Sequence, residues 1–244
     1  MRGRPLAVAY AASVSEALDG IETGRSFDRL VNFTDAVVAI AITVLVLPLT
    51  EIVRPADGQT VWGLIAEHAG QVSAFFFTFF VVALMWGVHN RVVNRMIGYD
   101  AVIFWLNTAW IAAIAFLPWP AGLYGSANSI AAYDPIEWVG GEGLGGIGLL
   151  YWGTLALISV LGSAMSHHAR RHPELLEPET ATAWAEVDGL GQYRGYLFGA
   201  YFLLTGVVSM FAPVIASWMP LGIIGLSIVV RPVEPRRSGR PATK

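Results

Sequence analysis

Three histidines in the second half of the chain, His167, His168 and His172, are the side chains best suited to bind a metal ion. His168 and His172 lie one helical turn apart, a spacing at which two imidazoles can share a zinc ion. However, Pro173 ends a helix at this point, and no carboxylate is suitably placed to complete the site. We therefore predict an interfacial cluster at the end of a membrane helix and no metal centre.

The sequence offers few residues or motifs for other kinds of catalysis. The sequence contains no cysteine, which excludes disulfides, thiol catalysis and cysteine-ligated metals. No catalytic serine motif is present. The glycine-rich segment GEGLGGIG at 141–148 lacks the preceding strand and the lysine of a phosphate-binding loop, so we interpret it as a flexible external turn leading into a helix. We expect neither enzymatic activity nor a cofactor.

The most unusual polar residue is Asp35, which lies in the apolar segment RLVNFTDAVVAIAITVLVLPL at 29–49. A carboxylate at the centre of a bilayer costs about 2.5–3.5 kcal/mol even on the milder scales. Beyond Asp35, the predicted helix interiors contain serines, threonines, Asn107 and His89, the last at the end of the second span. Carriers of protons or metals more often place several acidic or histidine residues near mid-membrane, which makes active transport the less favoured alternative.

The composition indicates that the elements positioning these residues are membrane helices. Hydrophobic residues make up 55% of the chain and charged residues 14%, and the mean hydropathy is +0.56. Since a span needs roughly 20 apolar residues, we predict an all-α integral membrane protein with six transmembrane helices. These lie near residues 30–49, 69–89, 101–123, 144–166, 194–211 and 214–230, the last two forming a hairpin divided by Pro213 and Pro220. The net charge of -3 offers no general basic surface for nucleic acid.

Orientation follows from the cations, which accumulate in cytoplasmic segments. Arginines precede the first span, follow the second and separate the fourth from the fifth, and five cations follow the last span, whereas the opposite side has only Arg54 and several acidic residues. Both termini are therefore predicted to be cytoplasmic. We divide the chain into an N-terminal arm (1–28), a six-helix transmembrane domain (29–231) and a disordered tail (232–244), with a short helix after Pro178 in the polar 167–193 loop.

Short motifs in the first three spans resemble a known family. The first span opens with R-x-x-x-F-T-D, formed by Arg29, Phe33, Thr34 and Asp35. This pattern resembles the R-x-x-x-F-S-D signature of the prokaryotic branch of the transmembrane protein 175 family of potassium channels. WGVHNR at 86–91 resembles the family's W-x-x-H-H-R, with Asn90 in place of the second histidine, and WLN at 105–107 and LPWP at 117–120 are in the family style. The specific resemblance covers about the first half of the chain.

The resemblance implies a homotetramer whose first helices line a central pore, constricted by aliphatic side chains. Carried over by alignment from Asp35, the constriction falls at Ile40, Val44 and Leu47, with Thr43 beside it. At about 100° per residue these three positions share one stripe of a helix, which is consistent with such a role. No TVGYG-like filter segment is present.

Asp35 points about 140° away from that stripe on the same helical geometry. We therefore interpret it as a hydrogen-bond acceptor that faces the other helices of its own subunit and anchors the first helix. The candidate donors are Arg29, Trp86, His89 and Asn107.

Together these features predict a potassium-permeable, modestly selective cation channel that conducts passively in a bacterial plasma membrane. Its expected partners are potassium ions, the lipid bilayer and three further copies of the chain. The alternatives are a secondary or proton-coupled ion transporter, and a membrane enzyme or scaffold that uses the loop at 167–193.

Overall fold

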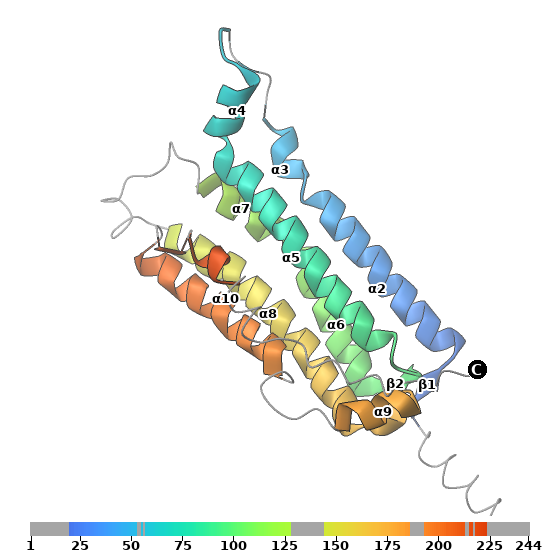
Figure 1. The fold of residues 1–244 in the computed structure, drawn as a ribbon. Helices are drawn as coiled ribbons and strands as arrows, with labels where there is room; N and C mark the ends of the chain where they lie inside the picture. Colours follow the sequence, from blue (N-terminus) through green and yellow to red (C-terminus); the bar gives the residue numbers. More distant parts are fainter. Residues whose placement is uncertain are drawn as a thin grey trace, which may run out of the picture.

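The computed structural model describes residues 20–52, 55, 57–127, 144–185, 193–212, 215–216 and 218–223, which are mostly helical. Figure 1 shows long helices running side by side, with two short strands at one end. In chain order the elements are β1 (Glu22–Thr23), α2 (Arg25–Val44), α3 (Leu47–Thr50), α4 (Val61–Glu67), α5 (Ala69–Val93), β2 (Gly98–Tyr99), α6 (Ala101–Phe116), α7 (Pro118–Ala127), α8 (Leu144–Arg171), the 3-10 turn η2 (Pro173–Leu175), α9 (Pro178–Ala185) and α10 (Arg194–Phe211).

Five described helical stretches are long and apolar enough to cross a membrane. They are Arg25–Thr50, Ala69–Val93, Ala101–Ala127, Gly146–Arg171 and Arg194–Phe211. These stretches confirm that the first five predicted spans are helices, with ends that agree to within a few residues. The helix α9 also confirms the short helix expected after Pro178, whereas α4 was not predicted.

The sixth predicted span is described only in part. Residues 215–216 and 218–223 are helical, while 214, 217 and 224–230 lie outside the described residues. The hydroxyl of Tyr201 on α10 donates a hydrogen bond of 2.6 Å to the carbonyl of Met219, so the chain turns back beside α10 as a hairpin requires. Most of the predicted arm (1–19), the tail (232–244) and residues 141–143 of the glycine-rich turn also lie outside the described residues, and α8 already begins at Leu144.

Local chemistry explains where these helices begin and end. Gly24 has φ of +59°, a conformation that favours glycine, and α2 starts directly after it at Arg25, earlier than the apolar run alone predicts. The carboxylate of Asp100 caps α6 by accepting the backbone N–H of Ile103 at 2.8 Å. At Pro118, which has no N–H, the chain continues almost without a break from α6 into α7, so the third span reaches Ala127.

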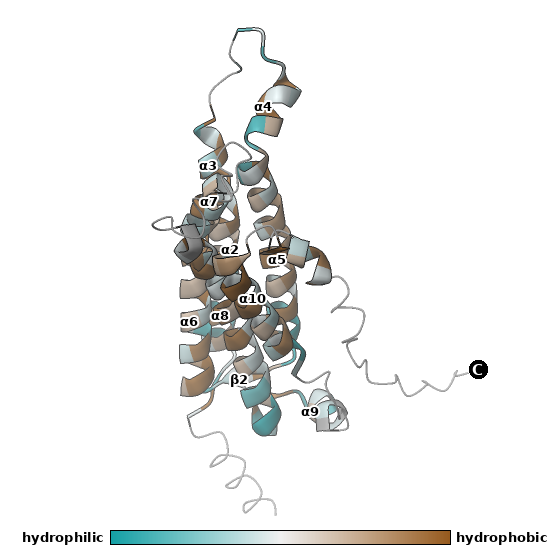
Figure 2. Ribbon diagram, turned by 90° about the vertical axis from the view of Figure 1, so that its left-hand side faces the viewer, coloured by the Kyte–Doolittle hydropathy of each residue, from teal (hydrophilic) through white to brown (hydrophobic). Residues whose placement is uncertain are grey.

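The bundle is organised around α8. This helix packs against α5, α6, α7 and α10, and its Tyr151, Trp152, Leu155 and Ile158 are at most 1% exposed. In contrast, α2 lies at the edge and packs mainly against α6 (Figure 1). Figure 2 shows apolar colouring along the length of the bundle and hydrophilic colouring at its ends. The edge position of α2 leaves one of its faces uncovered.

A small set of backbone contacts closes the end of the bundle at which α2 begins and α5 and α8 end. We call it the arginine-rich end, after Arg25, Arg91, Arg95, Arg170 and Arg194. There β1 pairs antiparallel with β2, and a Cβ on Gly98 would lie 2.7 Å from the carbonyl oxygen of Glu22, so only glycine fits. The N–H of Ile97 donates to Leu175 and that of Glu177 to Arg95, which joins the α5–α6 connection to the segment after α8.

Candidate functional site

The helix α2 has two distinct faces. Thr34, Val38 and Ala41 are buried and spaced three or four residues apart, so one stripe of the helix faces the bundle. On another stripe of the helix, the side chains of Ile40 and Leu47 are 63% and 55% exposed. Val44 is exposed as well, which places all three predicted constriction residues on the uncovered face.

Phe33 also belongs to the uncovered face. It lies seven residues before Ile40, which is close to two full turns, and its side chain is 58% exposed. Although the motif groups Phe33 with the anchoring residues, the structure does not bring its ring to them. We refer to Phe33, Ile40, Val44 and Leu47 as the uncovered apolar stripe of α2.

The end of α2 is not a straight continuation of the helix. The N–H of Val46 bonds to the carbonyl of Thr43, and that of Leu49 to the carbonyl of Val46, so the backbone tightens between Val44 and α3. Leu47 therefore lies beyond an irregular turn rather than on the ideal helix assumed from the sequence. Thr43 is exposed beside the stripe, and its hydroxyl donates to the carbonyl of Ile40 at 2.7 Å, which leaves its oxygen lone pairs available outward.

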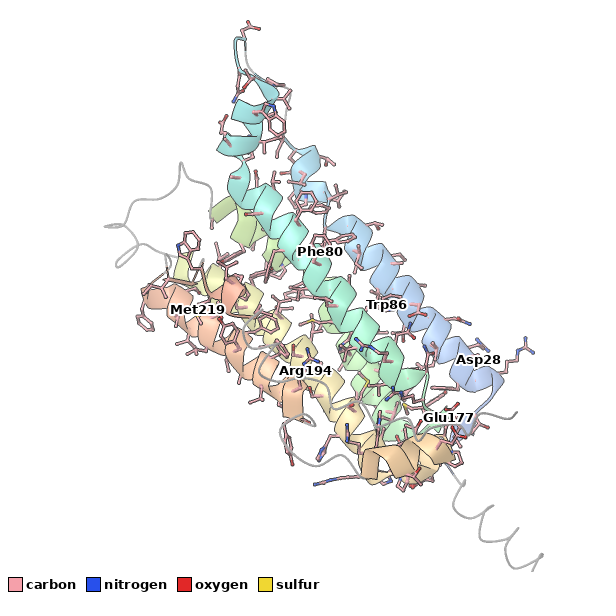
Figure 3. All side chains as sticks on the ribbon, viewed as in Figure 1. Asp28, Phe80, Trp86, Glu177, Arg194 and Met219 are labelled. Carbon is pink, nitrogen blue, oxygen red and sulfur yellow. The ribbon has the colours of Figure 1, made fainter. Side chains whose placement is uncertain are left out.

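Asp35 is held by α5. The indole N–H of Trp86 donates to the Asp35 carboxylate at 2.7 Å, and both side chains are half-buried. Figure 3 shows Trp86 on α5 on the side facing α2. Arg29, another of the candidate donors, is exposed and forms no ion pair in the described part of the chain. The donor to Asp35 is thus the neutral indole of Trp86 and not the charged guanidinium of Arg29, which the sequence left as an alternative.

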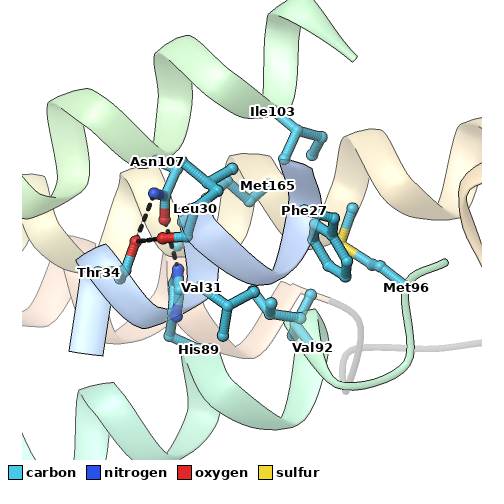
Figure 4. A pocket seen from close by; sticks show the side chains of 12 residues that line it. Phe27, Leu30, Val31, Thr34, His89, Val92, Met96, Ile103, Asn107 and Met165 are labelled. Carbon is cyan, nitrogen blue, oxygen red and sulfur yellow. Dashed lines mark hydrogen bonds between the residues drawn. The ribbon is translucent and has the colours of Figure 1, made fainter. Parts of the chain in front are cut away.

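A second polar connection joins α2, α5 and α6. The amide of Asn107 donates to the hydroxyl of Thr34 at 2.7 Å, and that hydroxyl donates to the carbonyl of Leu30 at 2.9 Å (Figure 4). The remaining amide oxygen of Asn107 lies 2.9 Å from Nε2 of His89, so Nε2 must carry the proton. We call Thr34, His89 and Asn107 the buried network.

The buried network is well shielded from solvent. Its three residues are 1%, 6% and 3% exposed in the order Thr34, His89 and Asn107, and the imidazole stacks on Trp110 with 4.2 Å between ring centroids. A cavity of about 20 Å³ adjoins it and is lined mainly by apolar side chains such as Phe27, Met96 and Met165 (Figure 4). This volume holds about one water molecule.

The histidines at the end of α8 have carboxylate partners, contrary to the sequence analysis. His168 Nε2 lies 2.7 Å from Asp100 Oδ2, and His172 Nδ1 lies 2.9 Å from Glu174 Oε1. The two imidazole rings are 4.3 Å apart. The partner of His168 is 68 residues away in the sequence, and only the packing of α6 against α8 brings it there.

Each pair joins a histidine to one carboxylate, and it is an ion pair only when the imidazole is protonated. Among the described residues, no group of three or more potential ligands could hold a metal ion. Burial raises the pKa of Asp100, but the N–H of Ile103 and the hydrogen bond and charge of His168 outweigh it and bring the pKa below its ordinary value. The sequence signal for Asp100 was its place directly before an apolar run, where a helix cap is expected.

Comparison with known proteins finds similarity to one family of channels. Residues 29–118 match the model of the family described as "Endosomal/lysosomal potassium channel TMEM175". A potassium channel of Streptomyces collinus is 31% identical over 96 residues, which cover 39% of this chain and 46% of that protein. The human endosomal/lysosomal proton channel TMEM175 is 24% identical over 227 residues, covering 92% of this chain and 40% of that protein. The chain thus spans less than half the length of these curated relatives.

A relative of similar length comes from Chamaesiphon minutus. Its potassium channel is 27% identical over 213 residues, which cover 85% of this chain and 92% of that protein. The crystal structure of a lysosomal potassium-selective channel TMEM175 homolog from the same organism matches with a TM-score of 0.59 at 20% identity, covering 85% of this chain and 100% of that one. This likeness shows the same fold. The resemblance seen in the sequence is confirmed over the segment that the family model matches.

Proposed function

We propose that this chain, whose residues 29–118 belong to the TMEM175 family, forms a potassium-permeable cation channel that conducts passively through a bacterial plasma membrane. The observation that carries the proposal is the uncovered apolar stripe of α2. Four subunits of six helices each would surround one axis, with this stripe of each α2 facing the axis. The relatives named above as potassium channels support the choice of ion.

The chemistry of the stripe suggests how such a pore would discriminate. Aliphatic side chains offer an ion no ligands, so a cation crosses the ring at Ile40, Val44 and Leu47 only while it keeps part of its hydration shell. The pore can also close at this ring by dewetting, that is, by loss of the water column between the aliphatic side chains. Selectivity for potassium over sodium would then be modest, with the lone pairs of Thr43 as the nearest polar atoms.

The contacts on the buried face of α2 also support the proposal. A pore-lining helix must keep a fixed rotation about its own axis. A rotation of about 100°, the angle between successive residues, would turn other side chains toward the pore in place of the aliphatic ones. The Trp86–Asp35 bond and the buried network fix that rotation at two neighbouring residues of α2. The secondary or proton-coupled transporter remains the alternative, but the engagement of Asp35 Oδ1 and His89 Nε2 in hydrogen bonds disfavours these residues as an ion-binding pair.

The topology is proposed on the same basis. Arginines gather at the end of the bundle where α2 begins, and Figure 2 shows hydrophilic colouring there. We place this end in the cytoplasm with both termini, and we keep the division into an arm (1–28), a six-helix domain (29–231) and a tail (232–244), noting that the helix itself begins at Arg25.

The test is potassium flux from proteoliposomes that contain the purified chain, diluted into a sodium buffer. We expect fast electrogenic flux, and a lower preference for potassium over sodium in Ile40→Asn, because an amide would wet and widen the constriction. The matched control is Leu203→Asn, an equally drastic change at an exposed residue of α10, and it should leave the permeability ratio unchanged.

Two outcomes would contradict the proposal. Absence of flux from correctly inserted protein would remove the channel function and favour the transporter or a membrane enzyme. Flux with the same ion preference in wild type and Ile40→Asn would show that α2 does not line the pathway.

A further inference from the structure

At the arginine-rich end, no arginine forms an ion pair with an acidic group of the described residues. In the described part of the chain, the ion pairs join His168 to Asp100 and His172 to Glu174, and none involves an arginine. Arg25, Arg29, Arg91 and Arg171 are exposed, so water can solvate their guanidinium groups. Arg95, Arg170 and Arg194 are half-buried, and these three need another source of stabilisation.

Two of the half-buried arginines share one aromatic ring. The guanidinium carbon of Arg170 lies 4.6 Å from the centroid of Trp184 on α9, and that of Arg95 lies 5.9 Å from the same centroid. Arg170 also donates to the carbonyl of Trp184 at 3.5 Å. Arg194, by contrast, stands over Phe198 of its own helix. We call Arg95, Arg170 and Trp184 the arginine–tryptophan clamp.

The parts of the clamp are fixed relative to one another. The carbonyl of Arg95 accepts the N–H of Glu177, which holds the residue before α9 against the end of α5. Trp184 packs on the hydrophobic core, and Arg170 lies in the last turn of α8. Three separate elements thus hold two like charges close together, an arrangement that repels itself unless an anion lies between or beside them.

The position of the clamp indicates where that anion comes from. Arg170 is the last residue but one of α8, and Arg95 follows the end of α5 by two residues, so in the proposed topology both lie at the depth of the membrane surface. Figure 1 shows α9 lying across this end of the bundle, and Figure 3 shows Glu177 at the same end. Tryptophan is favoured at this interface, and the cytoplasmic leaflet carries anionic lipids.

We propose that the arginine–tryptophan clamp binds the phosphate of an anionic phospholipid from the cytoplasmic leaflet. The two guanidinium groups donate hydrogen bonds to the phosphate oxygens, as arginine does in other phosphate sites. The ring of Trp184 holds the guanidinium planes and lies against the glycerol and upper acyl region of the lipid. The bound lipid fastens α9 to the ends of α5 and α8.

The test uses the full-length purified chain in a zwitterionic detergent, with short-chain phosphatidylglycerol as the probe. The readout is the thermal unfolding midpoint at increasing lipid, which gives an apparent affinity. Phosphatidylcholine and inorganic phosphate are the comparison ligands. We expect phosphatidylglycerol to raise the midpoint and the other two to leave it unchanged at the same concentrations.

The variant Arg95→Gln/Arg170→Gln should weaken the affinity for phosphatidylglycerol about tenfold or more. The matched control Arg25→Gln/Arg171→Gln removes the same charge from exposed positions at the same end, and its affinity should stay within about twofold of wild type. If the double variant does not fold, Arg170→Gln alone replaces it, with the same direction of change expected.

Three results would overturn the assignment. Equal weakening by the control would show a general effect of surface charge. An equal response to inorganic phosphate would make the ligand a free anion. The acidic residues Glu186 and Asp188 follow Trp184 in the sequence, and a wild type that does not respond to phosphatidylglycerol beside a Glu186→Gln/Asp188→Asn variant that does would show that a carboxylate of the chain itself neutralises the clamp. None of these readouts involves ion flux, so they are independent of the proposed channel function.

Discussion

The indole of Trp86 and the carboxylate of Asp35 form a direct side-chain hydrogen bond between α5 and α2. In Asp35→Ala the N–H of Trp86 loses its acceptor in a half-buried site, and we expect a loss of about 1–3 kcal/mol in the free energy of unfolding. Trp86→Phe removes the donor and keeps most of the ring. A double-mutant cycle of thermal unfolding in detergent should give a coupling of about 0.5–3 kcal/mol. Strictly additive losses would mean that the bond contributes nothing.

Asp100 makes the stability of the arginine-rich end dependent on acid. Because its folded pKa lies below the ordinary value of 3.8, the carboxylate stabilises the fold at neutral pH, and this contribution disappears as the pH falls below 3.8 and through the folded pKa. Asp100→Asn keeps the cap on α6 but cannot titrate. We therefore expect the unfolding midpoints of wild type and Asp100→Asn to converge as the pH falls from about 5 to 3. Asp28→Asn, at an exposed acid of α2, is the control, and convergence of equal size there would contradict the assignment to Asp100.

Residue types and spacings placed Trp86, His89 and Asn107 near the motif of α2, but they also named Arg29, which is exposed, and they did not predict which side chains bond. The spacing of Trp86 and His89 on one helix with Asn107 on the next indicated a shared location. The choice of donor depends on the rotation of α5 and α6 relative to α2, which no local pattern encodes. Likewise Asp100 and His168 meet only through tertiary packing. The exposure of Phe33, by contrast, was available from its seven-residue spacing to Ile40.

At the scale of elements, α8 and α10 approach closely because glycine lies between them. A Cβ on Gly199 would lie 2.9 Å from Cγ2 of Val160 and 3.3 Å from the carbonyl oxygen of Ala156. Gly199→Ala should therefore force the helices apart and cost about 1–3 kcal/mol in the free energy of unfolding. The control is Gly153→Ala on α8, where a Cβ meets nothing within 4 Å and where alanine should stabilise the helix by up to about 1 kcal/mol. Changes of the same sign at both sites would contradict this packing argument.

The elements themselves were largely predictable, since hydropathy and length determine which segments can lie in hydrocarbon. The residues at which the helices begin and end were less predictable. α2 begins in the polar sequence Arg25–Asp28 because Gly24 permits the turn before it, and the third span passes Pro118 because the helix can lose one N–H there. α4 was missed because a short helix of seven residues outside the membrane carries too weak a periodic signal.

At the scale of the whole molecule, the uncovered apolar stripe of α2 is explained either by lipid or by a water-filled axis shared with other copies. The absence of cysteine from the sequence allows these to be distinguished with a single introduced thiol. In the proposed channel, Ile40→Cys faces water, where the thiol ionises and reacts with a charged methanethiosulfonate reagent. We expect that reagent to abolish most of the potassium flux.

The comparison variant is Leu203→Cys, at an exposed position of α10 in the proposed lipid-facing surface. A thiol in hydrocarbon stays protonated and unreactive, so its flux should be unaffected by the reagent. Mild oxidation should also join Ile40→Cys subunits into a species of twice the 26.3 kDa chain mass, because a narrow constriction brings the introduced thiols of different subunits close together. Block and cross-linking at Leu203→Cys instead of Ile40→Cys would place the axis beside α10 and reverse the proposed arrangement of the bundle.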